Sequence, residues 1–179
     1  MAININSSLK TLKMLQNNSL TAKELVRLSV CTAILFVLQI ALSPLPNIEM
    51  VTLLILLYTR WFQKKALFII YVFVLLEGVF YGFHFWWFGY LYIWAFLWII
   101  ATLLDKRPRS VWTWAAFGGG FGLLFGLFFS LIYLLAGGIP TALAWWIAGI
   151  PFDILHGVSN FILIRILFQP LDRLYHSIA

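Results

Sequence analysis

The feature that most constrains this chain is a series of long apolar segments, each followed by a short polar break. A helix needs about 20 mostly apolar residues to cross the hydrocarbon core of a bilayer. Of the 179 residues, 63% are hydrophobic and 10% are charged, whereas a soluble domain carries about 25% charged residues. So few charged side chains cannot cover a water-facing surface. The composition therefore excludes a soluble enzyme, a nucleic-acid-binding domain and a disordered chain.

Proline, glycine and charged residues divide the apolar sequence into six segments. Pro44 ends the first segment, because proline has no amide proton to continue a helix, and we expect Pro170 to end the last. The pattern predicts an all-α integral membrane protein with six transmembrane helices in one compact bundle. The membrane domain covers 25–168, between an N-terminal segment at 1–24 and a tail at 169–179. The six spans are expected at 25–42, 48–62, 66–83, 87–104, 111–136 and 142–168.

The twelve Lys and Arg residues all fall on one side of this topology. With the N-terminus inside, they lie in 1–27, 60–65, 105–110 and the tail from Arg165, and the loops at 43–48, 83–90 and 136–142 hold none. An excess of Lys and Arg marks cytoplasmic loops. We therefore predict that both termini are cytoplasmic, and we interpret the formal net charge of +6 as a topology signal.

Ionisable residues at membrane depth are costly, so each is a candidate for function. Asp153, His156 and Asn160 share one helix face at spacings of three and four residues. They could line a ligand cavity, or they could form hydrogen bonds that hold helices together. The same two alternatives apply to Glu77. Glu49 could contact a ligand, or it could stabilise the start of the second span, where a carboxylate faces the positive end of the helix dipole.

Aromatic side chains gather near the predicted outer ends of the spans. An aromatic belt at the headgroup level is the ordinary explanation, but the inner side has fewer rings, which favours an outer pocket for a large, partly apolar ligand. We expect polar groups from Asn47, Glu49, His84, Asp153 and His156 to reach this pocket. The walls are expected to be Trp86, Trp87, Tyr90, Trp94, Trp145 and Trp146.

Small residues indicate two close helix contacts. Gly118, Gly122 and Gly126 lie four residues apart in the fifth span, and this spacing lets another helix of the bundle approach closely. Ser29 and Ala33 form a similar patch on the first span. That patch is suited to another helix of this chain or to a helix of a partner.

The sequence contains no motif for a catalytic, phosphate-binding or metal-binding site. We find no Gly-rich phosphate loop, no His-Glu-x-x-His and no nucleophile elbow. The single cysteine, Cys31, lies within an apolar segment and cannot form an internal disulfide. We therefore predict no catalytic residue, no metal ligand and no cofactor of the chain's own.

Three stretches, 45–54 (LPNIEMVTLL), 71–78 (YVFVLLEG) and 145–153 (WWIAGIPFD), resemble the S-components of Gram-positive bacteria. S-components are the substrate-binding subunits of energy-coupling-factor (ECF) vitamin transporters, which are ABC-type importers. Within that family the chain is most similar to the cobalamin-specific members. The resemblance implies a multi-pass protein of the cell membrane that binds cobalamin (vitamin B12) and its precursors from outside.

The resemblance also implies partners and a mechanism. An S-component associates with a transmembrane coupling protein and two cytoplasmic ATPases, which bind ATP and Mg, and it delivers its vitamin by toppling in the membrane. This chain would then not be an enzyme. The family docks on the coupling protein through an Ala-x-x-x-Ala motif in the first span. The matching positions here are Ser29 and Ala33, so the first position departs from the motif but stays small.

Two alternatives stay open at this point. The vitamin could be folate, riboflavin, pantothenate or a pyrimidine precursor, although the absence of Lys and Arg on the outer side argues against an anion. Cobalamin fits the predicted pocket because its corrin has a broad apolar edge and many amide side groups. Alternatively, the chain could be a stand-alone membrane enzyme that uses Asp153 and His156 for acid–base catalysis.

Overall fold

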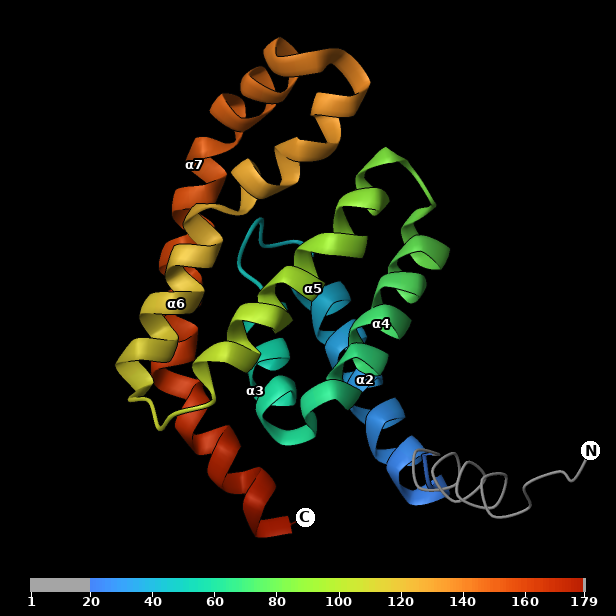
Figure 1. The fold of residues 1–179 in the computed structure, drawn as a ribbon, viewed down its shortest axis with the longest axis vertical. Coiled ribbons are helices and arrows are strands. Elements are labelled where there is room, and N and C mark those ends of the chain that lie inside the picture. Colours follow the sequence, from blue (N-terminus) through green and yellow to red (C-terminus); the bar gives the residue numbers. More distant parts are fainter. Residues whose placement is uncertain (1–19, 179) are drawn as a thin grey trace, which may run out of the picture.

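The computed structural model describes residues 20–178, and every regular element in that range is a helix (Figure 1). Three helices are long and apolar enough to cross a membrane, namely Ala22–Leu42, Phe85–Leu104 and the nearly continuous stretch Val111–Ile178. The predicted all-α membrane character is therefore confirmed at this level. Most of the predicted segment 1–24 lies outside the described residues. The elements are α2 (Ala22–Leu42), α3 (Val51–Phe62), the 3-10 helix η1 (Gln63–Lys65), α4 (Ala66–Tyr81), α5 (Phe85–Leu104), α6 (Val111–Leu123) and α7 (Phe125–Ile178).

Helix ends follow local side-chain chemistry. The hydroxyl of Thr21 accepts a hydrogen bond from the backbone N–H of Glu24, whose carboxylate accepts one from the backbone N–H of Thr21, so that α2 begins with a capping box. Ser110 caps α6 in the same way through the N–H of Thr113. Gly82, with φ +91°, ends α4 in a conformation that other residues rarely adopt.

The centre of the molecule is α3. Every residue from Val51 to Thr59 is buried, and the helix contacts α2, α4, α5 and α7. The hydroxyls of its buried threonines are satisfied locally, as where Thr59 donates to the carbonyl of Ile55 at 2.7 Å. The other helices form a shell around α3, with many apolar side chains on the outside of α2, α4 and α7. Such an outer surface suits a lipid environment rather than water.

The predicted fifth span is not one helix. The structure breaks it at Leu124, between α6 and α7. α6 packs against the later part of α7 so closely that a Cβ on Gly122 would lie 2.8 Å from backbone atoms of His156 and Gly157. The expected role of this glycine in close helix packing is thereby confirmed. Gly126, the third residue of the pattern, lies past the break and approaches the carboxylate of Asp153 instead.

α7 bends sharply and then runs on further than we expected. Non-helical backbone at Gly137 and Gly138 folds it back on itself, within the loop predicted at 136–142 (Figure 1). The expectation that Pro170 ends the last helix is wrong, because the helix continues to Ile178. Proline removes one backbone hydrogen bond, but the final turns are held by packing, since Tyr175 stacks on Trp61 with ring centroids 4.1 Å apart.

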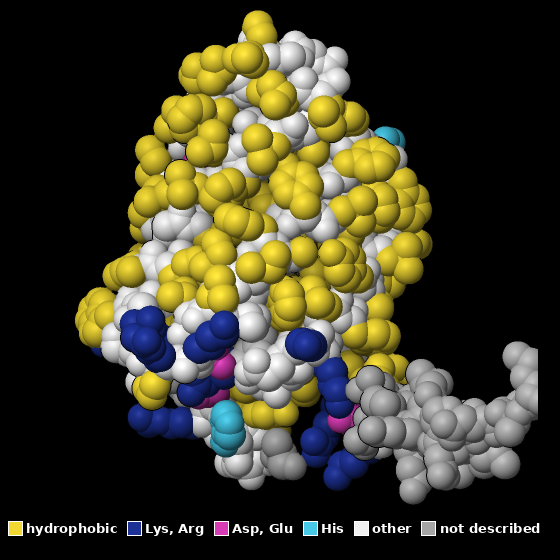
Figure 2. Space-filling view, viewed as in Figure 1, with side chains coloured by type: hydrophobic (Ala, Val, Ile, Leu, Met, Phe, Trp, Pro, Cys, Tyr) yellow, Lys and Arg dark blue, Asp and Glu magenta, His cyan; other side chains and the backbone are white. Residues whose placement is uncertain are grey.

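Charged side chains gather at one end of the molecule. In Figure 2 the Lys and Arg side chains lie at the end that carries the start of α2 and the end of α7, and apolar side chains cover the rest of this face. At this end the guanidinium of Arg60 forms two ion pairs, with N···O distances of 2.8 Å to Asp105 and 3.3 Å to Asp172. The indole N–H of Trp61 also donates to Asp172 at 2.8 Å.

Candidate ligand-binding site

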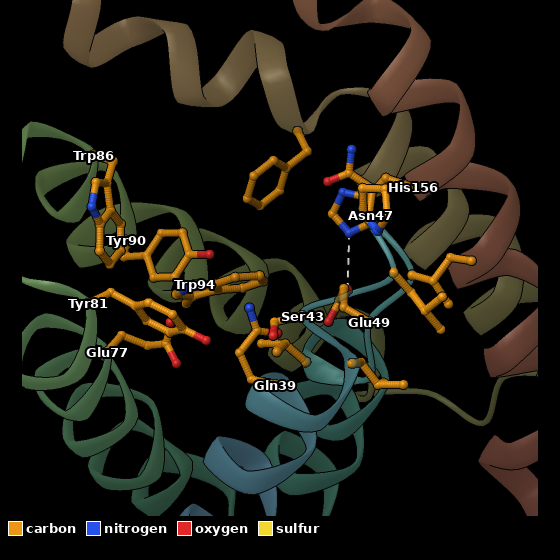
Figure 3. Close-up of a pocket in the computed structure, with 16 residues that line it drawn as sticks. Gln39, Ser43, Asn47, Glu49, Glu77, Tyr81, Trp86, Tyr90, Trp94 and His156 are labelled. Carbon is orange, nitrogen blue, oxygen red and sulfur yellow. Dashed lines mark hydrogen bonds and ion pairs between the residues drawn. The ribbon is translucent and has the colours of Figure 1, made fainter.

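Two adjoining cavities lie between the α2–α3 connection, α4, α5 and α7. The first, of about 480 Å³, is shown in Figure 3, and the second has about 590 Å³. Both volumes fall within the range of about 300–1,000 Å³ for small-molecule sites. The two cavities share the walls formed by Pro46, Asn47, Trp86, Tyr90 and Phe125. They can therefore be treated as two compartments of one site, which we call the first and second compartments.

One face of α5 supplies the aromatic wall. Trp86, Tyr90 and Trp94 follow one another at four-residue spacing, so their rings lie along one side of the helix and line the first compartment (Figure 3). Neighbouring rings meet edge to face, with centroids 5.0 Å apart for Trp86 and Tyr90 and 5.4 Å apart for Tyr90 and Trp94. Mutual packing of this kind fixes the orientation of each ring. On the opposite side, Trp145 lines the second compartment.

The connection between α2 and α3 is held against α7 by polar contacts. Asn47 adopts a positive φ of 57°, and its carbonyl accepts a hydrogen bond from the hydroxyl of Ser159 at 2.9 Å. Two residues later, Oε1 of Glu49 lies 3.0 Å from Nε2 of His156. These two contacts hold the connection as a wall that both compartments share.

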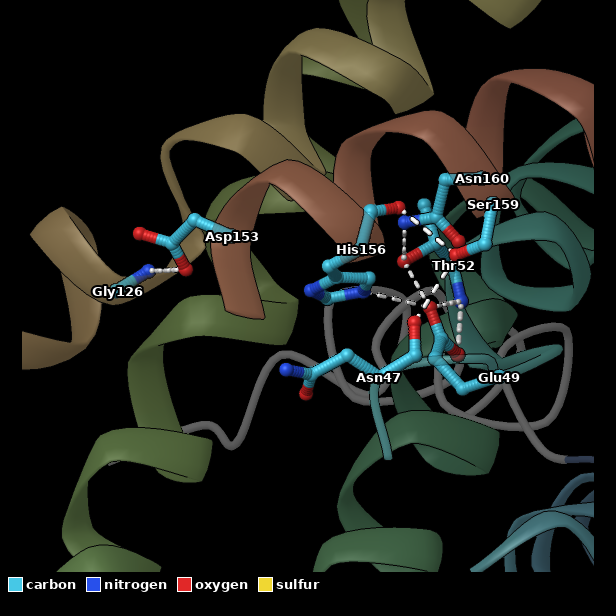
Figure 4. A network of polar contacts seen from close by, with 8 residues as sticks. All are labelled: Asn47, Glu49, Thr52, Gly126, Asp153, His156, Ser159 and Asn160. Atoms are coloured by element: carbon cyan, nitrogen blue, oxygen red, sulfur yellow. Dashed lines mark hydrogen bonds and ion pairs between the residues drawn. The ribbon is translucent and has the colours of Figure 1, made fainter. Parts of the chain in front are cut away.

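Glu49 stabilises the start of α3, which is one of the two roles that the sequence left open, and it also lines the first compartment. Its oxygens accept from the backbone N–H of Thr52 at 3.0 and 3.2 Å, which satisfies a free amide in the first turn of α3. The hydroxyl of Thr52 donates to Glu49 at 2.7 Å and accepts from Nδ2 of Asn160 at 3.1 Å. Figure 4 shows this network joining α3 to α7. Asn160 therefore serves helix–helix bonding.

Asp153 acts at the break in the predicted fifth span. Its Oδ1 accepts from the backbone N–H of Gly126 at 2.9 Å (Figure 4), which is an amide in the first turn of α7 and has no partner within the helix. A carboxylate at the start of a helix also opposes the helix dipole favourably. Asp153 is 6% exposed and lines the second compartment, and its Oδ2 has no hydrogen-bond partner in residues 20–178.

Glu77 and Trp94 also line the first compartment, and each carries a buried polar atom without a partner among the described residues. Glu77 lies on α4 and is 2% exposed, and no described residue donates a hydrogen bond to its carboxyl group. The indole N–H of Trp94, on α5, is likewise without an acceptor in the described part of the chain. Buried polar groups in proteins nearly always have hydrogen-bond partners. Unpaired groups that line one cavity are therefore candidates for ligand recognition.

Three residues expected at the pocket line neither compartment. Trp87 points to α4, where its indole N–H donates to the carbonyl of Val74 at 2.8 Å. One residue along a helix corresponds to a rotation of about 100°, which here turns Trp87 toward α4 while Trp86 faces the cavity. His84 is exposed in the connection before α5, and Trp146 also lies outside both linings. The other expected residues, Asn47, Glu49, Trp86, Tyr90, Trp94, Trp145, Asp153 and His156, line one or both compartments.

Several lining residues were not singled out in the sequence. Tyr81 is one of them. It lies four residues after Glu77 on α4, and this spacing places both side chains in the first compartment. Phe125 and Phe129 repeat the same spacing at the start of α7 and line the second compartment. Gln39 and Ser43 come from the end of α2. Their positions at helix ends give no comparable signal.

The chemistry of the site is set by rings and carboxyl groups. Glu49, Glu77 and Asp153 provide the acidic groups, and among residues 20–178 no Lys or Arg lines either compartment. The described residues also contain no group of three His, Cys, Asp or Glu side chains placed to hold a metal ion. Such a site suits a ligand that has flat apolar surfaces and hydrogen-bond donors.

The small patch predicted on the first span lies on the outside of α2. Ser29 and Ala33 are both exposed. The apolar side chains beside them are exposed as well, with Val26 at 63% and Val30 at 53%. Within residues 20–178 no helix of this chain covers that face.

Comparisons with protein-family models, with curated proteins and with solved structures found no match for the chain.

Proposed function

We propose that this chain is the substrate-binding S-component of an ECF-type vitamin transporter and that it binds cobalamin and its precursors. The observation that carries the proposal is the two-compartment site, which is lined by Trp86, Tyr90 and Trp94 and by three carboxyl groups. Its lining contains no Lys or Arg from the described part of the chain. A corrin ring system offers a broad apolar edge for the rings and many amide groups for the carboxyl oxygens.

In the proposed topology six helical segments cross the cell membrane of a Gram-positive bacterium and both termini are cytoplasmic. The gathering of Lys and Arg at one end supports this orientation (Figure 2). The α2–α3 connection, which carries Asn47 and lines both compartments, is one of the predicted outside loops, which contain no Lys or Arg. The short second segment of this topology is α3, with 12 residues.

The energy for uptake comes from partner subunits in this proposal. The sequence has no phosphate-binding motif, so two cytoplasmic ATPases bind ATP and Mg, and a transmembrane coupling protein joins them to this chain. The exposed face around Ser29 and Ala33 supports docking of the coupling protein on α2, because small side chains let two helix backbones approach closely.

Calorimetry on the purified chain tests the substrate. We expect tight binding of cobalamin and cobinamide, and weak or no binding of folate, riboflavin, pantothenate and a pyrimidine precursor. Tight binding of one of the latter, with none of cobalamin, would contradict the substrate and leave an S-component for another vitamin. Co-purification with the ATPases tests the family separately.

A stand-alone membrane enzyme has less support. That alternative needs Asp153 and His156 to act together on one substrate, yet Asp153 lines the second compartment and His156 lines the first. Asp153 is engaged by the N–H of Gly126, and His156 is engaged by Glu49. If the isolated chain forms a product from a candidate ligand without partner subunits, that result would support the enzyme alternative.

A further inference from the structure

The two compartments each contain a buried carboxyl group that the protein leaves partly or wholly unpaired. In the first compartment, Glu77 accepts no hydrogen bond from any described residue. In the second, Oδ1 of Asp153 accepts from the N–H of Gly126, and its Oδ2 has no partner in residues 20–178. The two compartments share walls that include Asn47 and Tyr90. A ligand that fills both compartments therefore meets a carboxyl group in each.

The first compartment also offers a hydrogen-bond donor. Trp94 is 2% exposed, its indole N–H has no acceptor in residues 20–178, and its ring lines the same cavity as Glu77. An unpaired donor and an unpaired acceptor in one cavity suit a ligand group that can both donate and accept, such as a carboxamide or a hydroxyl. The carboxamide, of which a corrin carries many, has an N–H₂ that donates twice and a carbonyl that accepts.

We infer that the site recognises its ligand through at least two uncharged carboxamide groups, one in the first compartment at Glu77 and Trp94, and one in the second at Oδ2 of Asp153. This inference rests on the proposed function, because it specifies which groups of the bound vitamin are recognised. A carboxamide satisfies a carboxyl group in either protonation state, since it can donate to a carboxylate and accept from a carboxylic acid.

The same arrangement rejects a carboxylate on the ligand. A carboxylate has no N–H to donate, and like charges that share a site repel each other. Among residues 20–178, no Lys or Arg lines either compartment to offset the repulsion. Conversion of a single recognised amide to an acid alters very few atoms of the ligand. It should nevertheless cause a large loss of binding affinity. A site that binds a polar group strongly rejects an analogue that leaves buried polar groups unpaired.

Ligand derivatives provide the first test. Calorimetry compares cobalamin with a set of derivatives in which one corrin carboxamide at a time is hydrolysed to a carboxylate. We expect two or more derivatives of the set to bind at least about 30-fold more weakly than cobalamin, and the others to bind about as well. Equal binding by every derivative would overturn the inference and leave the proposed function intact. No binding of cobalamin itself would overturn both.

Variants assign the groups to residues. Glu77→Gln keeps an acceptor and removes the charge, so it should restore much of the affinity for one particular acid derivative while cobalamin still binds. Asp153→Asn keeps an oxygen for Gly126 and should rescue a different derivative. Glu77→Leu and Trp94→Phe should each weaken cobalamin binding about tenfold. If neither amide variant changes the preference between amide and acid ligands, the inference is wrong.

A matched control is available on the same helix as Trp94. Trp98 also lies on α5, but its indole N–H donates to the carbonyl of Gln63 at 3.1 Å, away from both compartments. Trp98→Phe should leave cobalamin affinity unchanged even if it lowers the melting temperature. If Trp98→Phe lowers cobalamin affinity as much as Trp94→Phe does, the effect of Trp94→Phe is due to helix stability, and ligand recognition by Trp94 is contradicted.

Discussion

Replacement of Gly122 by alanine should weaken the fold where α6 and α7 cross. A Cβ at this position would lie 2.8 Å from the backbone nitrogen of Gly157 and 2.8 Å from the carbonyl carbon of His156. Backbone atoms cannot rotate away as a side chain can. The two helices would therefore have to separate by roughly half an ångström to restore ordinary van der Waals contact.

The magnitude follows from a comparison with Gly120, two residues earlier on the same helix. Nothing lies within 4 Å of a Cβ at Gly120, so Gly120→Ala should gain only the helix propensity of alanine, about 1 kcal/mol. Gly122→Ala gains the same propensity but also overpacks the crossing, which costs about 1–3 kcal/mol. The free energies of unfolding of the two variants should therefore differ by about 1–3 kcal/mol.

Thermal unfolding of both variants in the same detergent measures this difference, and ligand affinity gives a second measure. Each kcal/mol corresponds to about 2–4 °C for a chain of this size. Because the contact involves the backbone of His156, which lines the first compartment, Gly122→Ala should also weaken binding while Gly120→Ala should not. A Gly122→Ala protein as stable as Gly120→Ala would refute the close crossing.

Three further predictions concern docking, energy and the charged end. Ala33→Trp should abolish uptake by the assembled transporter and leave vitamin binding nearly intact. The control Val79→Trp, on the exposed face of α4, should not abolish uptake. Loss of binding in the isolated Ala33 variant would show that this face packs within the bundle. Uptake into proteoliposomes should need ATP and the partner subunits, and uptake by this chain alone under a proton gradient would instead make it a secondary transporter. Arg60→Ala should lower stability by about 1 kcal/mol, because it removes two ion pairs, whereas Lys64→Ala should have little effect on the melting temperature.

The helical segments could be predicted because membrane helices depend on features that a sequence displays directly. The length of the first apolar segment predicts α2, and Pro44 predicts where α2 ends. The Gly137–Gly138 pair accounts for the bend in α7. The break at Leu124 could not be predicted, since residues 111–136 form one apolar run. One free amide beside that break, that of Gly126, is satisfied by Asp153, which lies 27 residues after Gly126. Contacts of this range are not visible in a local pattern.

The site could be predicted in outline but not in detail. Aromatic and polar residues near the predicted outer ends do converge on two cavities, yet the side chain that faces inward depends on helix phase. The four-residue spacing of Trp86, Tyr90 and Trp94 is visible in the sequence and favours Trp86 over Trp87 as the ring that faces the cavity. Whether Glu77 pairs with another helix or faces a cavity depends on its neighbours in space, which sequence spacing does not give.

The burial of α3 on all sides has a consequence for how the protein is made. Its 12 residues extend about 18 Å, which is well short of the roughly 30 Å of a hydrocarbon core, and its neighbours are incomplete when it emerges from the ribosome. In the proposed topology, α3 is therefore a poor substrate for insertion on its own. We expect it to enter the bilayer as a hairpin with α4, joined by the three residues of η1, while Lys64 and Lys65 stay on the cytoplasmic side.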